Sequence, residues 1–373
     1  MTAPRCRPDL RREVRAFARH ERDRGTYLPS CNAWMDGHDP EFSRLLGERG
    51  WIGMTWPRRY GGGERTELER YAVIEELLAA GAPIAAHWFA DRQIGPQLLR
   101  IGTEEQRQRM LAPMAAGNLH VSIGMSEADA GSDLAAVRTT ATRSRGGWVV
   151  NGTKLWTSNA HRNHLVVVLC RTGERVTDRH AGLSQLIVGL DAAGVDVAPI
   201  AGIDGDSHFC EVTFRDVFVD EADVLGEIGA GWQQVTAELA RERSGPERFL
   251  SVMPLVDETV SLIAQTPTAG DLELLGSAVG ELAVLRQLSI DVADALTRGE
   301  VPDLDAALVK DLGTRFEQEL VDAISRSEVA ASSMTGSFSS LLRSALLAAP
   351  GFTLRGGATE VLRSIVGRAA LQG

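Results

Sequence analysis

Residues 126–133 read Ser-Glu-Ala-Asp-Ala-Gly-Ser-Asp, and residues 151–159 read Asn-Gly-Thr-Lys-Leu-Trp-Thr-Ser-Asn. The first stretch predicts a loop of small residues, whose backbone N–H groups and hydroxyls can approach a planar or phosphorylated ligand. In the second stretch, Asn151-Gly152 is typical of a hairpin turn, and the strand after it carries Trp156. An indole at the edge of a sheet can stack on a ligand ring. An ordinary hairpin with a core tryptophan fits the same pattern, and residue chemistry alone leaves both interpretations open.

Around these two stretches, from residue 119 to about 226, the hydrophobic pattern is that of strands. Three β-rich runs stand out, at 149–150, 165–169 and 212–214. Glycine-containing pairs between such runs indicate turns, at Gly146-Gly147, Asn151-Gly152 and Asp204-Gly205. We therefore expect a middle domain at residues 119–226 that forms a compact antiparallel β-barrel or sandwich.

The flanking segments have helical patterns. Before the strands, Leu10, Val14 and Phe17 share one helical face, and the pairs Thr66/Glu69 and Thr103/Gln106 have the spacing of capping boxes. After the strands, helical apolar stripes return, with a break at 266–270. One stripe before the break contains Trp232, Val235 and Leu239, and one after it contains Leu275, Val279, Leu282 and Val292. We expect an α+β fold in three domains: an N-terminal helical domain at 1–118, the β-barrel at 119–226, and a C-terminal helical bundle at 227–373.

Composition excludes several classes of protein. The 373 residues carry 39 Lys+Arg and 50 Asp+Glu, a formal charge of −11, which argues against a general nucleic-acid binder. The four cysteines are far apart and form no CxxC, which favours a reduced, cytoplasmic chain without disulfides. No signal-peptide pattern and no apolar stretch of about 18 residues is present, so we expect no membrane span. His161 and His164 lack further metal ligands nearby in the sequence, and we expect no metal site.

The two opening stretches together resemble the flavin-binding signature of the acyl-CoA dehydrogenases. Further matches bracket them: Gly50-Trp51 with Tyr60-Gly61-Gly62, Glu211–Val217, Leu225–Trp232, and Phe352–Arg363. The resemblance extends from about residue 40 to the C-terminus and is weak between about 264 and 350. It implies FAD as the cofactor, a three-domain fold like the one expected above, and an acyl-CoA or acyl carrier protein thioester as the substrate.

The resemblance assigns residues to the flavin. Ile123, Met125 and Ser126 are implied at the isoalloxazine ring, Trp156 and Ser158 beside its reactive edge, and Ser132 near the flavin or the phosphopantetheine arm. A further group lies where the family contacts the flavin phosphates: Ala358, Thr359 and Glu360. Ala358 replaces a usual threonine, which implies that one phosphate contact is lost.

Dehydrogenation of a thioester needs a carboxylate base for the Cα proton and donors for the carbonyl oxygen. Many family members have the base at the position of Gly356, which here has no side chain but keeps its N–H as a donor. A second subgroup carries the base on the long helix after the barrel, where the register from Gly231 leads to Glu242. Arg243 is then implied in orienting the base or holding the substrate, and Glu247 is the alternative base. A solvated Arg-Glu-Arg helix face is the competing interpretation.

Two elements that hold the adenosine half of a neighbour's flavin in homomeric relatives are missing, at about 263–271 and 330–337. We therefore expect a homodimer or homotetramer, or a hetero-oligomer with a related subunit, and an electron acceptor that reoxidises the flavin. The leading hypothesis is an active acyl-CoA dehydrogenase-like oxidoreductase. The alternatives are a non-catalytic or half-site subunit of a heteromeric enzyme, and a flavin monooxygenase on the same fold. Gly356→Glu would supply a second base position only if the backbone tolerates a side chain.

Overall fold

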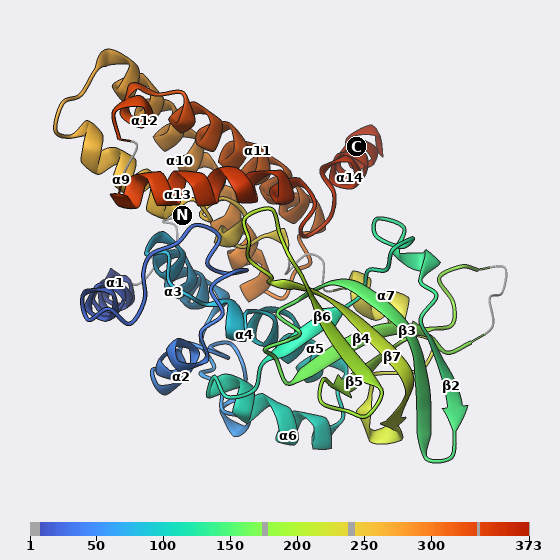
Figure 1. The fold of residues 1–373 in the computed structure, drawn as a ribbon. Helices are drawn as coiled ribbons and strands as arrows, with labels where there is room; N and C mark the ends of the chain where they lie inside the picture. The colour runs from blue at the N-terminus through green and yellow to red at the C-terminus, as the bar shows by residue number, and fades with distance from the viewer. Residues whose placement is uncertain (1–7, 174–177, 238–242, 334–335, 373) are drawn as a thin grey trace. The chain divides into compact units, whose positions relative to one another are not determined.

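The computed structural model describes residues 8–173, 178–237, 243–333 and 336–372 (Figure 1). The chain divides into two compact units. The helical unit combines Met1–Gly37, Arg65–Ile84 and Ala240–Gly373, and the sheet unit combines His38–Glu64 and Ala85–Leu239. The secondary structure changes near residues 118 and 226, as the sequence predicts, while the division into three domains at these boundaries stays a prediction.

The helical unit contains two N-terminal helices and a C-terminal bundle, whose orange and red helices carry the labels α9 to α13 in Figure 1. The described elements are α1 (Pro8–Asp23), α3 (Glu67–Ala79), η5 (Pro246–Arg248), α9 (Met253–Ile263), α10 (Ala269–Thr297), α11 (Asp303–Ser325), α12 (Glu328–Ser332), α13 (Gly336–Ala348), η6 (Ala349–Thr353) and α14 (Thr359–Gln372). α10 packs along α11, and α3 packs on both α1 and α10.

Local sequence signals explain where these helices begin. Thr66 and Glu69 form the predicted capping box of α3. A second capping box, between Thr268 and Asp271, starts α10 at Ala269, within the predicted break at 266–270. The predicted stripe on α10 is confirmed only at its C-terminal end, because Val292 is buried whereas Val279 is 66% exposed.

The described part of the sheet unit holds eight strands, seven short helices or helical turns, and two further single turns. The strands are β1 (Val121–Gly124), β2 (Thr140–Ser144), β3 (Gly147–Ser158), β4 (Leu165–Arg171), β5 (Leu183–Gly189), β6 (Val195–Ile200), β7 (Phe209–Asp220) and β8 (Val224–Leu225). The helical elements are α2 (Pro40–Glu48), η1 (Arg58–Tyr60), α4 (Ala85–Phe89), η2 (Ala90–Ile94), α5 (Gly95–Ile101), α6 (Glu104–Ala115), α7 (Gly231–Thr236), η3 (Leu134–Ala136) and η4 (Glu221–Asp223).

The predicted closed antiparallel barrel is wrong, because the sheet is mixed and open. Its strand order is β6-β7-β3-β2-β4-β5-β8, with β1 added to β4 in parallel. β2 also meets β4 in parallel, through Thr140 and Arg171. Among the described residues, the terminal strands β6 and β8 do not pair with each other, and β8 is only two residues long.

The buried core of the sheet comes from alternating residues of its long central strands. β7 buries Cys210, Val212, Phe214, Val217 and Val219, in the period expected for a strand with one face inward. A second apolar cluster joins α5 and α6 to β1, β4 and β5. The sheet is therefore packed on its inner side, while residues of the opposite parity along β3 and β7 face outward.

The predicted turn at Asn151-Gly152 is wrong. Both residues lie inside β3, and the β2–β3 hairpin turns at residues 145–146 instead. The Asn151 side chain donates to Asp216 Oδ1 at 3.0 Å and accepts from the Asp216 N–H at 2.9 Å, which ties β3 to β7 at a bulge. Gly152 is needed because a Cβ there would lie 2.5 Å from Thr139 Oγ1. The turn predicted at 204–205 is confirmed in position, and the one predicted at 146–147 lies one residue earlier.

The Gly-Trp and Tyr-Gly-Gly elements of the sequence build a buried tryptophan corner. Trp51 and Trp56 are 3% and 1% exposed. Gly62 passes so close to Trp56 that a Cβ would lie 2.2 Å from its carbonyl oxygen. Thr103 and Gln106 form the predicted capping box of α6. No helix in the described part of the chain is long and apolar enough to cross a membrane.

Candidate active site

In the sheet unit, β1 and β3 carry the residues that the sequence assigns to the flavin ring. Ile123 lies in β1, and Met125 and Ser126 are the first two residues after that strand. The Ser126 carbonyl accepts from the N–H of Leu155 at 2.9 Å, so the loop after β1 is attached to β3. These predicted residues therefore lie on adjoining segments of one unit.

Trp156 stands on a bulge of β3. Its φ is +60°, and the pairing with β7 shifts register between Lys154 and Thr157. At this bulge the indole points outward. Trp156 is 55% exposed, although its neighbours Thr157 and Ser158 are buried. The ring lies edge-on to Phe209, with the centroids 5.8 Å apart. The interpretation of Trp156 as a core residue is therefore wrong, and the indole presents a face that a planar ring can contact.

Ser158 is fixed by a chain of hydrogen bonds that sequence reasoning missed. The Ser122 hydroxyl donates to the Ser158 carbonyl at 2.8 Å, Asn163 Nδ2 donates to Ser122 Oγ at 2.9 Å, and His38 Nε2 lies 2.8 Å from Asn163 Oδ1. Burial lowers the pKa of His38, which favours the neutral imidazole. The residues are far apart in the sequence, so no local pattern could have indicated this chain. His161 and His164 are engaged elsewhere, with Cys210 and the His120 N–H.

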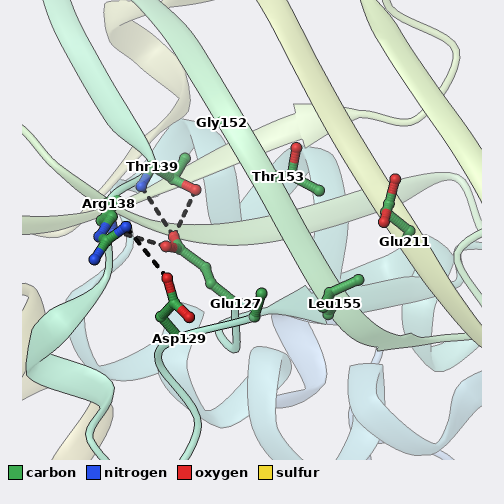
Figure 2. A pocket seen from close by; sticks show the side chains of 9 residues that line it. Glu127, Asp129, Arg138, Thr139, Gly152, Thr153, Leu155 and Glu211 are labelled. Carbon is green, nitrogen blue, oxygen red and sulfur yellow. Dashed lines mark hydrogen bonds and ion pairs between the residues drawn. The ribbon is translucent and has the colours of Figure 1, made fainter.

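Figure 2 shows a pocket between the two opening stretches of sequence. Its volume is about 260 Å³, and its lining combines the loop after β1, the two residues before β2, and residues of β3 and β7: Glu127, Ala128, Asp129, Arg138, Thr139, Gly152, Thr153, Leu155 and Glu211. The Glu127 carboxylate accepts from the Arg138 N–H at 2.7 Å and from the Thr139 N–H and hydroxyl at 2.9 and 2.6 Å. Ser132, further along the same loop, is exposed beside the Asp133–Arg179 ion pair.

In the helical unit, the C-terminal motif forms a glycine corner between η6 and α14. Gly356 and Gly357 have φ of +71° and +103°, a region that favours glycine. Arg243 Nε donates to the Gly356 carbonyl at 3.1 Å. The predicted residues Arg243 and Gly356 therefore contact each other, although 113 positions separate them.

Arg355, the residue before this corner, is held by a buried network. Its Nη2 donates to Ser251 Oγ at 2.8 Å and to Glu317 Oε2 at 2.9 Å, and its Nη1 contacts Asn32 Oδ1. The guanidinium also lies over Trp34, 4.7 Å from the ring centroid. Burial lowers the pKa of Arg355 to about 10 and raises that of Glu317, because neither charge is solvated.

Lys310 of α11 fixes the other end of the motif. Its Nζ donates to the Phe352 carbonyl at 2.9 Å and to Thr314 Oγ1 at 2.7 Å. The side chain is fully buried, and desolvation, reinforced by the nearby Arg248 and Arg355, lowers the pKa of Lys310 to about 7. The backbone from 352 to 357 is thus attached to α11 through Lys310 and, by way of Arg355, through Glu317.

Glu242 and Glu247 are the two candidate bases. Glu242 lies outside the described residues. Glu247 is 1% exposed, its carboxylate folds back over Gly245, and its Oε1 lies 3.6 Å from Arg248 Nε. Glu247 therefore belongs to a buried ion pair of the helical unit.

The predicted phosphate-contact residues surround the start of α14. Ala358 precedes the helix, Thr359 is its first residue, and Glu360 is exposed in its first turn. The Thr359 hydroxyl is buried and has no hydrogen-bond partner among the described residues. A helix N-terminus with an unused hydroxyl favours an anionic group.

Comparison with known proteins identifies the family. The family models "Acyl-CoA dehydrogenase, N-terminal domain" and "Acyl-CoA dehydrogenase, middle domain" match residues 7–118 and 122–217. Acyl-CoA dehydrogenase FadE26 of Mycobacterium tuberculosis is 31% identical over 353 residues, which cover 87% of this chain and 86% of the relative. The chain belongs to the acyl-CoA dehydrogenase family. It is therefore an oxidoreductase of a family whose members bind FAD.

Solved structures agree with this assignment. The "Tcur3481-Tcur3483 steroid ACAD" superimposes with a TM-score of 0.86 at 26% identity, covering 100% of this chain and 98% of the other. The ChsE4-ChsE5 complex from Mycobacterium tuberculosis superimposes with a TM-score of 0.84 at 28% identity, covering 100% and 99%. The fold and family that the sequence motifs predict are confirmed.

The residues present fit FAD. The sheet unit offers the exposed face of Trp156, and the helical unit offers the buried, unused Thr359 hydroxyl at a helix N-terminus. An aromatic face suits a flavin ring, and a helix N-terminus suits a phosphate. The assignment of individual residues to the flavin stays a prediction.

Proposed function

We propose that this chain introduces an α,β double bond into an acyl thioester, carried by CoA or by an acyl carrier protein. The Cα proton passes to the carboxylate of Glu242, and a hydride leaves Cβ. FAD, when bound, supplies the acceptor for that hydride. The observation that carries the proposal is the glycine corner, where Gly356 can donate its N–H to a carbonyl oxygen while its own carbonyl is fixed by Arg243.

The donor matters because the negative charge of the deprotonated thioester accumulates on its carbonyl oxygen. A donor that is already in place stabilises this charge without further reorganisation. The Phe352–Gly357 backbone is attached at both ends to α11, through Lys310 and through the Arg355–Glu317 pair. This support suits an N–H that must keep its direction during the reaction.

The base assignment follows from the alternatives. Gly356 has no carboxylate, and Glu247 is engaged with Arg248 in the interior of the helical unit. Glu242 is the carboxylate next to Arg243, which contacts the Gly356 carbonyl. A positioned carboxylate of this kind typically contributes about 10²–10⁴-fold to proton transfer.

We further propose a hetero-oligomer with a related subunit in the cytoplasm. The missing adenosine-holding elements support this, as do two similar structures that are each named for a pair of proteins, Tcur3481-Tcur3483 and ChsE4-ChsE5. One of these proteins is called a steroid ACAD, so thioesters with bulky acyl groups belong in a substrate screen. A half-site subunit is the competing hypothesis, and it predicts a protein that is colourless when purified alone.

The test is deuterium exchange at Cα, followed by NMR, with a panel of acyl-CoA and acyl carrier protein thioesters in D₂O. Glu242→Gln should slow exchange by about 10²-fold or more while flavin and thioester still bind. Glu319→Gln, an exposed carboxylate on α11, is the matched control and should exchange at the wild-type rate. Wild-type exchange in Glu242→Gln, with loss of exchange in a folded Glu247→Gln, would assign the base to Glu247.

A further inference from the structure

The space in which a side chain at position 356 would begin is occupied by a cation. A Cβ built on Gly356 would lie 2.8 Å from Nη1, 2.9 Å from Cζ and 3.0 Å from Nη2 of Arg248. Three nearly equal distances mean that the flat face of the guanidinium covers this position. Where many relatives have a carboxylate, this chain has a glycine with an arginine lying against it.

Arg248 is held firmly in this place. It ends the short helix η5, is 3% exposed, and lies over the Trp34 ring, 5.2 Å from the centroid. Glu247 Oε1 lies 3.6 Å from Arg248 Nε, the guanidinium nitrogen that is bonded to the aliphatic part of the side chain. The guanidinium therefore lies close to both an aromatic ring and a glycine, contacts that suit its planar shape.

The surroundings of Gly356 are rich in buried positive charge. Besides Arg248, the described side chains Arg243, Lys310 and Arg355 are buried around the motif. The buried carboxylates there are Glu247 and Glu317, and Glu317 is saturated by Arg355 and the Ser251 N–H. Half-buried Asp36 adds a weaker negative charge near Arg355. A buried guanidinium attracts nearby negative charge more strongly than a solvated one does.

We propose that Arg248 stabilises the negative charge that develops on the thioester carbonyl oxygen when Cα is deprotonated. This inference rests on the proposed function. The base takes the Cα proton, the electron pair of the broken C–H bond delocalises into the C=O group, and the oxygen gains the charge. Arg248 acts on that oxygen from beside Gly356, whose N–H is the direct donor.

A purely structural Arg248 would give a different result. In that case its removal would lower stability and would leave the polarisation of a bound carbonyl unchanged. The carbonyl stretching frequency of a thioester labelled with ¹³C at C1 separates the two, because it falls as the carbonyl becomes more polarised. The 2-enoyl product of the thioester that exchanges fastest in the deuterium screen is the probe, since the proposed reaction does not consume it.

Three variants make the experiment decisive. Arg248→Gln should raise the carbonyl frequency of the bound 2-enoyl thioester and slow Cα exchange by at least tenfold. Arg248→Lys keeps the charge and should recover part of both effects. Arg70→Gln removes another buried guanidinium of the helical unit, paired with Glu67 at 2.8 Å, and should move neither readout.

The outcomes separate this inference from the proposed function. A folded Arg248→Gln protein with the wild-type frequency and exchange rate would overturn the role of Arg248 alone. If Arg248→Gln does not fold, the same measurement is made on Gly356→Ala, whose Cβ must displace the Arg248 guanidinium. An unchanged carbonyl frequency in Gly356→Ala would reject the proposal. If no thioester exchanges on the wild-type protein, the proposed function is wrong and the inference falls with it.

Discussion

The ammonium of Lys154 lies 2.8 Å from the Glu127 carboxylate, and this pair joins the loop at 126–133 to strand β3 (Figure 2 shows the Glu127 side). Lys154 is completely buried and also donates to the Met125 carbonyl at 2.9 Å. Burial lowers the pKa of Lys154, with Glu127 opposing the shift. For Glu127 burial acts to raise the pKa, but Lys154 and three further donors hold it below its usual range. The lowered pKa of Glu127 favours its carboxylate form, and that negative charge opposes the effect of burial on Lys154.

Removing the charge of Glu127 should be costly, because it leaves a buried ammonium without its counter-charge. We expect Glu127→Gln to lower the free energy of unfolding by about 3–5 kcal/mol, measured by denaturant titration. The control is Asp129→Asn in the same pocket, whose exposed pair with Arg138 at 3.2 Å should be worth about 0–1 kcal/mol. Equal losses in the two variants would show that the Glu127–Lys154 pair does not support the loop.

The same pair sets a pH dependence. The folded pKa of Glu127 is lower than the unfolded one, so its stabilisation is complete above the unfolded pKa and is lost as the pH falls through the folded pKa. Below about pH 4.3, the ordinary value for glutamate, wild type should therefore lose stability faster than Glu127→Gln. A constant difference between the two proteins from pH 6 to pH 3 would contradict this.

Gly356→Glu should not create a working base. The residue would have to adopt φ of +71°, which costs about 1–2 kcal/mol for an L-residue, and its Cβ would displace the Arg248 guanidinium. A carboxylate that still fitted would pair with Arg248. We expect the Glu242→Gln, Gly356→Glu double variant to exchange Cα deuterium no faster than Glu242→Gln alone. Recovery to within tenfold of wild type would show that the backbone tolerates the change.

Much of the fold could be predicted from short patterns. The capping boxes at Thr66 and Thr103 depend on residues three positions apart, and both are present in the structure. The Asn151-Gly152 turn failed for a long-range reason, because Asn151 is held by Asp216 across a β-bulge. Closure of the sheet likewise depends on the pairing of distant strands, which no local pattern specifies.

The candidate site was predicted where motifs carry it and missed where packing does. Family motifs indicated Trp156 and Gly356, but no motif indicated that Arg248 would lie against Gly356, since 108 positions separate them in the sequence and their contact depends on tertiary packing. The scarcity of lysine in the sequence has a structural counterpart. Lys154 and Lys310 are the chain's two lysines, and both are completely buried. An ammonium has three N–H donors and a guanidinium has five, so a buried lysine needs fewer hydrogen-bond acceptors than a buried arginine.

Trp156→Ala should lower flavin occupancy, because the indole offers an exposed ring face beside the predicted flavin residues. The loss of stacking is expected to weaken binding by about 0.5–1.5 kcal/mol beyond the buried area. Phe218→Ala on β7 is the control, since it removes another exposed aromatic ring of the same sheet that is 53% exposed. The flavin-to-protein absorbance ratio at micromolar protein measures both. Full occupancy in Trp156→Ala would mean that the site lies elsewhere.

Lys310→Met should alter how stability depends on pH. In the folded protein the pKa of Lys310 is about 7, against 10.5 for the free side chain, so between these values the unfolded chain binds more protons. Wild-type stability should therefore rise with pH across this window relative to the Lys310→Met protein, by no more than about 5 kcal/mol. Below pH 7 the difference should be constant, because Lys310 is protonated in both states. Arg315→Met, which removes an exposed cation of α11, is the control and should show a difference from wild type that is independent of pH. Melting temperatures and denaturant midpoints from pH 6 to 10 measure these differences, and a flat difference for Lys310→Met would mean that the buried ammonium keeps its ordinary pKa.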